Sequence, residues 1–184
     1  PTTSSMMKAI SLFSKKNEVA DGIYYNKREE NIIDIEQMGL PQSEKTIAEM
    51  LKPEGYHNIH IGKWHLGHAN DFLPRKHGFD ESLRIDQGSL FLPEDDKNVI
   101  NAKLEFDPID KVLWGNLPYA VNFNEGPRMN PDGHLTDYLT NEAVKVIEKN
   151  KNRPFFLYLA YWAVHSPLQA KKEDYEKLSF IENH

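Results

Sequence analysis

Two segments of the chain share one pattern, in which an amphipathic stretch is followed at once by an apolar one. In the first, "GLPQSEKTIAEMLKPEGY", Ile47, Met50 and Leu51 fall at i, i+3 and i+4, the spacing of one helix face. Ser43 is a residue type that caps helices, and Gly55 is one that ends them. The pattern predicts a helix that begins after Ser43 and ends at Gly55.

The stretch after this helix alternates between apolar and polar positions. "YHNIHIG", residues 56–62, predicts a strand that runs directly into Lys63. A helix followed at once by a strand is half of an α/β repeat. The alternation therefore predicts an α/β fold.

The second segment repeats this order near the end of the chain. "HLTDYLTNEAVKVIEKNKNRP" predicts an amphipathic helix, whose stripe is Leu135, Tyr138, Leu139, Ala143, Val146 and Ile147. "PFFLYLAYWAV", residues 154–164, is continuously apolar and predicts a strand buried on both faces, as in a parallel sheet. His165 follows that strand directly, and the polar tail from Lys171 predicts the start of another helix.

Residues 84–131 have no sustained period. They contain several prolines and the acidic turn "PEDDK", so we interpret them as a long irregular excursion, the place expected for variable substrate loops. The acidic residues Glu94, Asp95 and Asp96 lack the alternating spacing of a calcium loop. A solvated turn is the interpretation that this spacing favours.

Composition narrows the class of protein. The 184 residues are enough for one domain with a core, and 39% hydrophobic and 27% charged residues are ordinary for a globular protein. The net charge of −6 argues against a nucleic acid or an anionic membrane as partner. No apolar run is long enough to cross a bilayer. The chain opens on Pro1 rather than Met, so the missing signal peptide says little about its compartment.

Both predicted strands end in a turn that carries histidine. Ligands of open parallel sheets bind outside the carboxyl ends of the strands. Lys63 and His65 follow one strand and His165 follows the other, so we expect the three side chains to converge on a tetrahedral anion. Cationic groups at strand ends are costly to bury unless an anion or a carboxylate meets them.

The alternative for any single histidine is an ordinary hydrogen-bonded role in the core or at the surface. We assign that role to His57, His60, His68, His77 and His134. His68 and His77 lie in turn-like sequence, next to Gly67 and Gly78, where substitution is expected to cost little.

Several stretches of the sequence resemble the sulfatase family. "GYHNIHIGKWHLG" resembles the second signature of that family, and "FLPRKHGFDE", residues 72–81, is similar to the stretch that follows it. "GLPQSEKTIAEMLKPEGY" is similar to the helix before the signature, and "RPFFLYLAYWAVHSPLQA" resembles the family's later strand with its substrate-binding histidine. The resemblance covers most of residues 39–83 and 131–171.

The resemblance implies an alkaline-phosphatase-like α/β sandwich around a mixed, mostly parallel sheet, incomplete in this chain. It implies hydrolysis of a sulfate monoester on a sulfated small molecule or sugar, in a secreted, periplasmic or lysosomal protein. By the same resemblance Lys63 contacts the sulfate and the nucleophile, and His65 hydrogen-bonds the nucleophile's hydroxyl and helps to collapse the covalent intermediate. His165 holds the sulfate and protonates the leaving oxygen.

Two parts of the family's site have no counterpart in the sequence. The nucleophile is a formylglycine made from the cysteine or serine of C-x-P-S-R, and Ca²⁺ is held by an upstream acidic pair and a downstream Asp-Asn pair. This chain has no cysteine and neither pair at those places. "PTTSSMMKA" can be laid on the second half of the first signature, so that the chain begins two residues after the nucleophile.

Residues 1–184 are therefore predicted to be a partial sulfatase catalytic domain, an internal fragment that is inactive alone. One alternative is a non-catalytic sulfatase-like protein that keeps an anion-binding pocket. A phosphodiesterase of the same superfamily is a weaker one.

Overall fold

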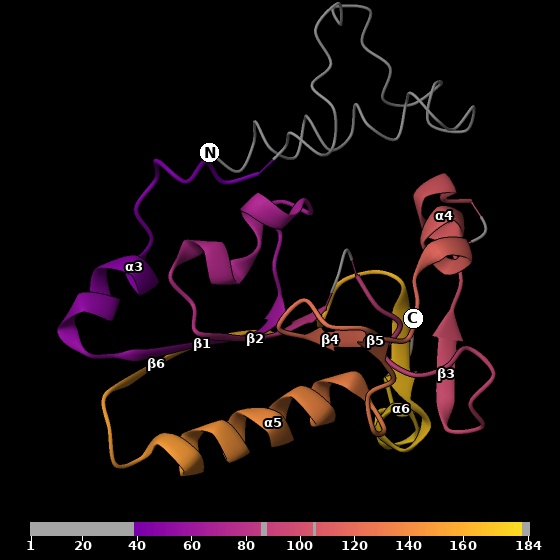
Figure 1. The fold of residues 1–184 in the computed structure, drawn as a ribbon. Helices are drawn as coiled ribbons and strands as arrows, with labels where there is room; N and C mark the ends of the chain where they lie inside the picture. Colours follow the sequence, from indigo (N-terminus) through magenta and orange to yellow (C-terminus); the bar gives the residue numbers. More distant parts are fainter. Residues whose placement is uncertain (1–38, 86–87, 105, 182–184) are drawn as a thin grey trace, which may run out of the picture.

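The computed structural model describes residues 39–85, 88–104 and 106–181, and its centre is a five-stranded sheet (Figure 1). The sheet has the order β5-β4-β2-β1-β6, and β1 pairs in parallel with both β2 and β6. β4 and β5 extend the sheet in antiparallel pairing. The bounds of these strands are β1 His57–Lys63, β2 Glu81–Ile85, β4 Val121–Phe123, β5 Arg128–Met129 and β6 Phe155–Ala160. The stretch "PTTSSMMKA" lies outside the described residues.

Helices cover both faces of the sheet (Figure 1). On one face, Ile59 and Ile61 of β1 pack in a buried cluster that includes Leu135 and Leu139 of α5 (Leu135–Asn150). The opposite face lies under α3 (Ile47–Leu51) and the 3-10 turns η2 (Lys52–Glu54), η3 (Asn70–Phe72) and η4 (Pro74–His77). This layering confirms the predicted α/β fold with a mixed central sheet.

The first predicted helix exists, but its cap is Thr46 rather than Ser43. The Thr46 hydroxyl accepts a hydrogen bond of 3.1 Å from the Glu49 backbone amide, and the Glu49 carboxylate accepts one of 2.8 Å from the Thr46 amide. This reciprocal capping box satisfies two amides that the helix itself cannot pair. The helical segment ends at Gly55, which adopts a left-handed φ of 81° as predicted.

The buried face of α3 also differs from the prediction. Ile47 is 58% exposed and Met50 is 52% exposed, whereas Ala48 is 1% exposed and packs with Trp64 and Phe79. The aromatic side chains bring the helix so close to the sheet that the small alanine faces inward. The i, i+3, i+4 spacing therefore marked the wrong face.

β6 is an edge strand in the described part of the chain, not a strand covered on both faces. It pairs with β1, and none of its six residues is buried. Tyr158 is 43% exposed. The strand also ends at Ala160 rather than at residue 164, and Trp162 beyond it lies in the core, before a turn at residues 163–164.

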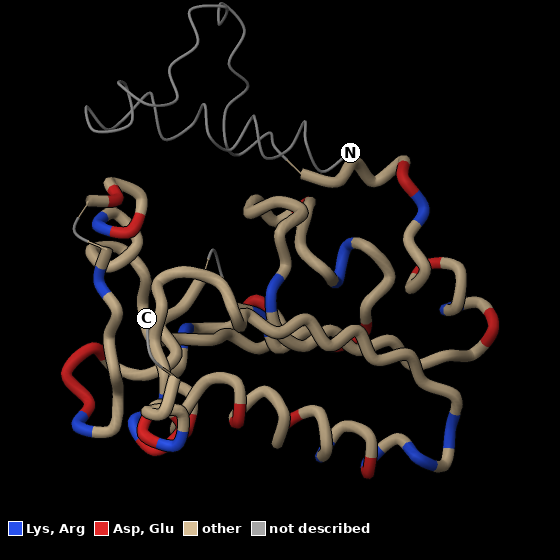
Figure 2. Tube along the Cα trace, turned by 180° about the vertical axis from the view of Figure 1, so that it is seen from behind, with Lys and Arg blue, Asp and Glu red and all other residues tan. Residues whose placement is uncertain are grey.

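Residues 84–131 are more regular than predicted. They contain β4, β5, the strand β3 (Val99–Ala102) and the helix α4 (Pro108–Asn116). β3 pairs antiparallel with β7 (Leu168–Lys171), which leads into the predicted terminal helix, α6 (Lys172–Lys177). These elements are too short to show a period. Figure 2 shows acidic and basic residues interspersed along α5 and around α6.

No helix in the described ranges is both long enough and apolar enough to span a bilayer.

Candidate active site

Gly62 sets the position of Lys63 at the carboxyl end of β1. Its φ of 110° is unfavourable for residues with a side chain, and its backbone lies directly against the Ala160 carbonyl of β6. A Cβ at this position would overlap that carbonyl oxygen. Gly62 thus allows the backbones of β1 and β6 to approach closely at the end of the sheet that carries Lys63.

Lys63 lies over the aromatic ring of Trp162. Its ammonium nitrogen is 4.5 Å from the ring centroid, within the range of a cation–π contact. Burial lowers the pKa of the Lys63 ammonium group, and no carboxylate among the described residues acts against this shift. A partly desolvated cation without a carboxylate partner is suited to bind an anion.

His165 reaches the same tryptophan from the segment after β6. The two rings stack with centroids 4.2 Å apart and an interplanar angle of 27°, and the His165 amide donates a 3.0 Å hydrogen bond to the Trp162 carbonyl. The His165 Nδ1 lies 2.6 Å from the Ser166 carbonyl oxygen, which can only accept, so Nδ1 carries the proton. Nε2 is then the nitrogen available to a ligand.

His65 lies in the loop between these groups. Partial burial lowers the pKa of His65, and the positive charges of Lys63, His68 and His165 lower it further. The ring is therefore held neutral near pH 7, where it can accept a hydrogen bond. Its loop is fixed on both sides, since Trp64 Nε1 donates 2.7 Å to the Phe72 carbonyl and the Leu66 carbonyl accepts 2.7 Å from Leu40.

The structure therefore brings Lys63, His65 and His165 together at the carboxyl ends of two adjacent parallel strands. Trp162 is the member of this group that sequence reasoning missed. Trp162 belongs to the apolar segment 154–164 that predicts a buried strand, and it is 4% exposed. Its ring also contacts both Lys63 and His165. The sequence contained one indication of this role, since Trp162 lies only three residues before the site residue His165.

Several other histidines have structural roles. His60 is fully buried, and its ring nitrogens lie 2.9 Å from the Ser82 hydroxyl and 3.2 Å from the Lys63 carbonyl. His57 pairs with Glu81 at 2.9 Å. His77 is also fully buried, so we expect its substitution to lower the stability of the fold, whatever its effect on hydrolysis. The 3-10 turn η4 points its side chain into the core beside Trp64, which a turn-like sequence does not reveal.

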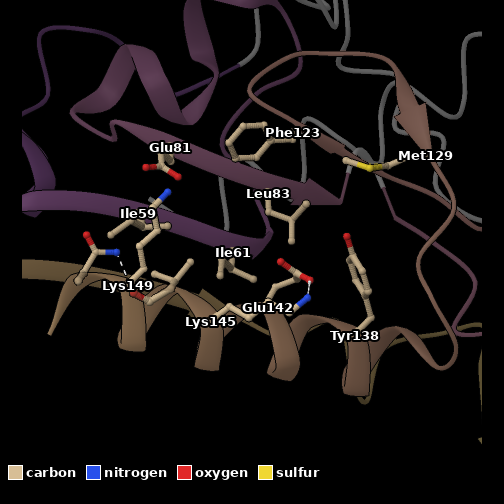
Figure 3. A pocket seen from close by; sticks show the side chains of 12 residues that line it. Ile59, Ile61, Glu81, Leu83, Phe123, Met129, Tyr138, Glu142, Lys145 and Lys149 are labelled. Carbon is tan, nitrogen blue, oxygen red and sulfur yellow. Dashed lines mark hydrogen bonds and ion pairs between the residues drawn. The ribbon is translucent and has the colours of Figure 1, made fainter.

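A cavity of about 300 Å³ lies elsewhere, between α5 and the sheet (Figure 3). Its floor includes Ile59, Ile61 and Leu83, and an ion pair of 2.6 Å between Glu142 and Lys145 lies at its rim. The floor of the cavity is apolar, and of the charged groups in its lining Glu142 and Lys145 pair with each other. We therefore retain the Lys63 cluster as the candidate active site.

The described residues contain no group of three or more His, Asp or Glu side chains that could hold a metal ion. The acidic residues Glu94 and Asp96 form local contacts. Glu94 pairs with Lys103, and the Asp96 carboxylate accepts a 2.7 Å hydrogen bond from the Asn98 amide. The sulfatase family generally uses Ca²⁺, but the described side chains do not fit that ion.

The chain is an α/β protein with a lysine and two histidines at the strand ends, and comparison with known proteins identifies its family. A family model described as Sulfatase matches residues 3–183, so the chain belongs to the sulfatase family. The chain is 37% identical over 146 residues to N-acetylgalactosamine-6-sulfatase of Mus musculus, covering 73% of this chain and 25% of that protein. It is 35% identical over 144 residues to arylsulfatase G of Mus musculus, covering 71% and 27%.

Solved structures agree with this assignment. Ps i-CgsB in complex with k-i-k-neocarrahexaose shares 34% sequence identity and a TM-score of 0.61, covering 79% of this chain and 32% of that one. The likeness confirms the predicted alkaline-phosphatase-like fold, here as a partial domain. The chain spans about a quarter of the length of the curated relatives named above.

Proposed function

We propose that the protein containing this chain hydrolyses sulfate monoesters, with Lys63, His65 and His165 acting on the ester. The observation that carries the proposal is that the Lys63 ammonium group and the His165 ring meet on one tryptophan ring at the strand ends. Membership of the sulfatase family supports the choice of sulfate over other tetrahedral anions.

Lys63 stabilises the charge that develops on the sulfate. Attack on sulfur places negative charge on the sulfuryl oxygens and on the leaving oxygen, and a pre-placed cation lowers the energy of that state. Lys63 is half-buried, so its charge is screened by water less than that of an exposed lysine.

His165 protonates the leaving oxygen. Its Nδ1 proton is engaged by the Ser166 carbonyl. In the doubly protonated ring, Nε2 gives its proton to the departing alkoxide, and the ring is left neutral. A proton donor matters most when the leaving alcohol is a poor leaving group. In this role His165 also helps to hold the sulfate.

His65 contacts the nucleophile. Its lowered pKa keeps the ring neutral, so that it accepts a hydrogen bond from the nucleophile's hydroxyl group and later assists collapse of the covalent intermediate. The chain has no cysteine, so a cysteine-derived formylglycine would come from outside it. We propose that the nucleophile and the Ca²⁺ ligands belong to the remainder of the protein, and that these 184 residues alone are inactive.

A sulfated sugar is the substrate class that we propose. One relative is an N-acetylgalactosamine-6-sulfatase, and another was solved in complex with a neocarrahexaose. Residues 84–131 are the segment proposed to select the sulfate ester.

The test uses the full-length protein and the 184-residue chain side by side. We expect the full-length protein to hydrolyse nitrophenyl sulfate and the isolated chain to give no turnover above background. Sulfate binding without turnover in the full-length protein would favour the non-catalytic alternative. Faster hydrolysis of bis-nitrophenyl phosphate than of nitrophenyl sulfate would favour a phosphodiesterase.

A further inference from the structure

We propose that Trp162 is a positioning residue of the sulfate ester site, whose ring fixes the Lys63 ammonium group relative to the His165 imidazole. The inference rests on the proposed function, because it assigns a role in that reaction to the groups that Trp162 holds.

The ring of Trp162 is anchored by packing. It belongs to the buried cluster that also contains Ile61, Ile85 and Phe91. The backbone at Gly88 closes on its outer edge, since a Cβ there would lie 2.9 Å from the ring. The indole Nε1 has no hydrogen-bond partner within the described segments. The core, rather than a polar contact, therefore decides where the ring lies.

The faces of this anchored ring carry two groups that come from different elements. Lys63 leaves β1 and places its ammonium nitrogen 4.5 Å from the ring centroid. His165 follows β6 and stacks at 4.2 Å. Negative charge on the ring face attracts a cation, and an aliphatic side chain of similar size cannot supply that attraction.

His165 needs the Trp162 ring to hold it in place because its own side chain is exposed. Its side chain lies at the surface of the described structure, where little besides the Trp162 ring and the Ser166 carbonyl restricts it. Lys63 must reach the sulfate oxygens while His165 reaches the leaving oxygen of the same ester. A displacement of about 1 Å in such a geometry can reduce the rate about 100-fold.

The experiment compares W162L, W162F and F155L in the full-length protein. W162L removes the aromatic face and W162F keeps one. F155L makes an aromatic-to-leucine change at the start of β6, at a partly buried residue that packs against the same cluster and lies outside residues 84–131. The measured quantity is the ratio of kcat/KM for phenyl sulfate to kcat/KM for nitrophenyl sulfate. This ratio does not depend on the fraction of folded enzyme, so a purely structural defect leaves it unchanged.

We expect W162L to lower the ratio about tenfold, because the poorer leaving group depends more on a well-placed proton donor. W162F should keep the ratio within about threefold of wild type, and F155L should not change it. A W162L ratio equal to wild type, or an equal fall in F155L, would overturn the inference.

A second measurement does not depend on turnover. In protein labelled at histidine, the His165 ring protons, assigned by their loss in H165A, should resonate upfield because they lie over the Trp162 ring. The shift should disappear in W162L and persist in W162F. The inference requires both results, and an unshifted His165 signal in the wild type overturns it. The proposed function fails separately, if the wild type hydrolyses neither sulfate or H165A leaves the ratio unchanged.

Discussion

Gly62→Ala should destabilise the protein far more than Gly55→Ala, although both glycines have a positive φ. Gly55 has φ 81° and open space around it, so alanine there adds only backbone strain, about 1–2 kcal/mol. Gly62 has φ 110°, and an added Cβ would also overlap the Ala160 carbonyl oxygen. Forcing an extra carbon into a packed site adds about 1–3 kcal/mol. The total for Gly62→Ala is therefore about 2–5 kcal/mol.

The assay is equilibrium unfolding in urea of the full-length protein and its two variants, followed by tryptophan fluorescence. The midpoint should fall for both variants and clearly further for Gly62→Ala. Because Lys63 is the next residue, the surviving folded Gly62→Ala protein should also lose sulfatase activity, whereas Gly55→Ala should keep it. Equal midpoints for the two variants would refute the argument that close contact of β1 with β6 requires the glycine.

Three further predictions concern residues that support the sheet. Burial lowers the pKa of His60 from 6.5 to about 4. Between pH 6.5 and pH 4, His60 is therefore protonated in the unfolded chain but neutral in the folded chain. The free energy of unfolding should fall by about 3 kcal/mol as the pH drops from 6.5 to 4. Urea titrations over this pH range should show a weaker pH dependence for His60→Gln. An unchanged pH dependence in that variant would contradict the lowered pKa of His60. Thr46→Ala should lower the free energy of unfolding by about 1 kcal/mol, and Thr46→Ser should lower it much less. Equal values for the two variants would contradict a stabilising role of the Thr46 hydroxyl in the capping box. His77→Ala should lower the free energy of unfolding, measured by urea titration, by about 2–5 kcal/mol. His68 is only half-buried, so His68→Ala should lower it by less. The opposite order would argue against burial of His77.

The parts of the fold that were predictable have local signals. The sequence of α5 has a long helical period, and the structure buries Leu135, Leu139 and Ala143 of the predicted stripe. Ile147, which also belongs to that stripe, is 46% exposed. β1 was predicted to within a residue at each end, although its residues 58–62 are all buried rather than alternately buried and exposed. β3, β4, β5 and the edge position of β6 depend on pairing between distant segments, which no local pattern encodes.

The candidate site was predictable for a related reason. Lys63, His65 and His165 follow strand-like runs, and parallel pairing of β1 with β6 places both ends at one edge. The contact between them was not predictable, because an apolar aromatic run gives no indication of which ring lies beneath a lysine from another strand. Trp162 was therefore assigned to the core, which describes its burial but not its neighbours.

The central claim is that Lys63 and His165 form a sulfate ester site, and kcat/KM for nitrophenyl sulfate in the full-length protein tests it most directly. K63A and H165A should each lower kcat/KM by about 100-fold or more, because each removes a group that contacts the charge of the transition state. K145A removes an exposed lysine that pairs with Glu142 on α5 and should stay near the wild-type value. Wild-type kcat/KM in K63A and H165A, in an enzyme that hydrolyses the ester, would contradict the account.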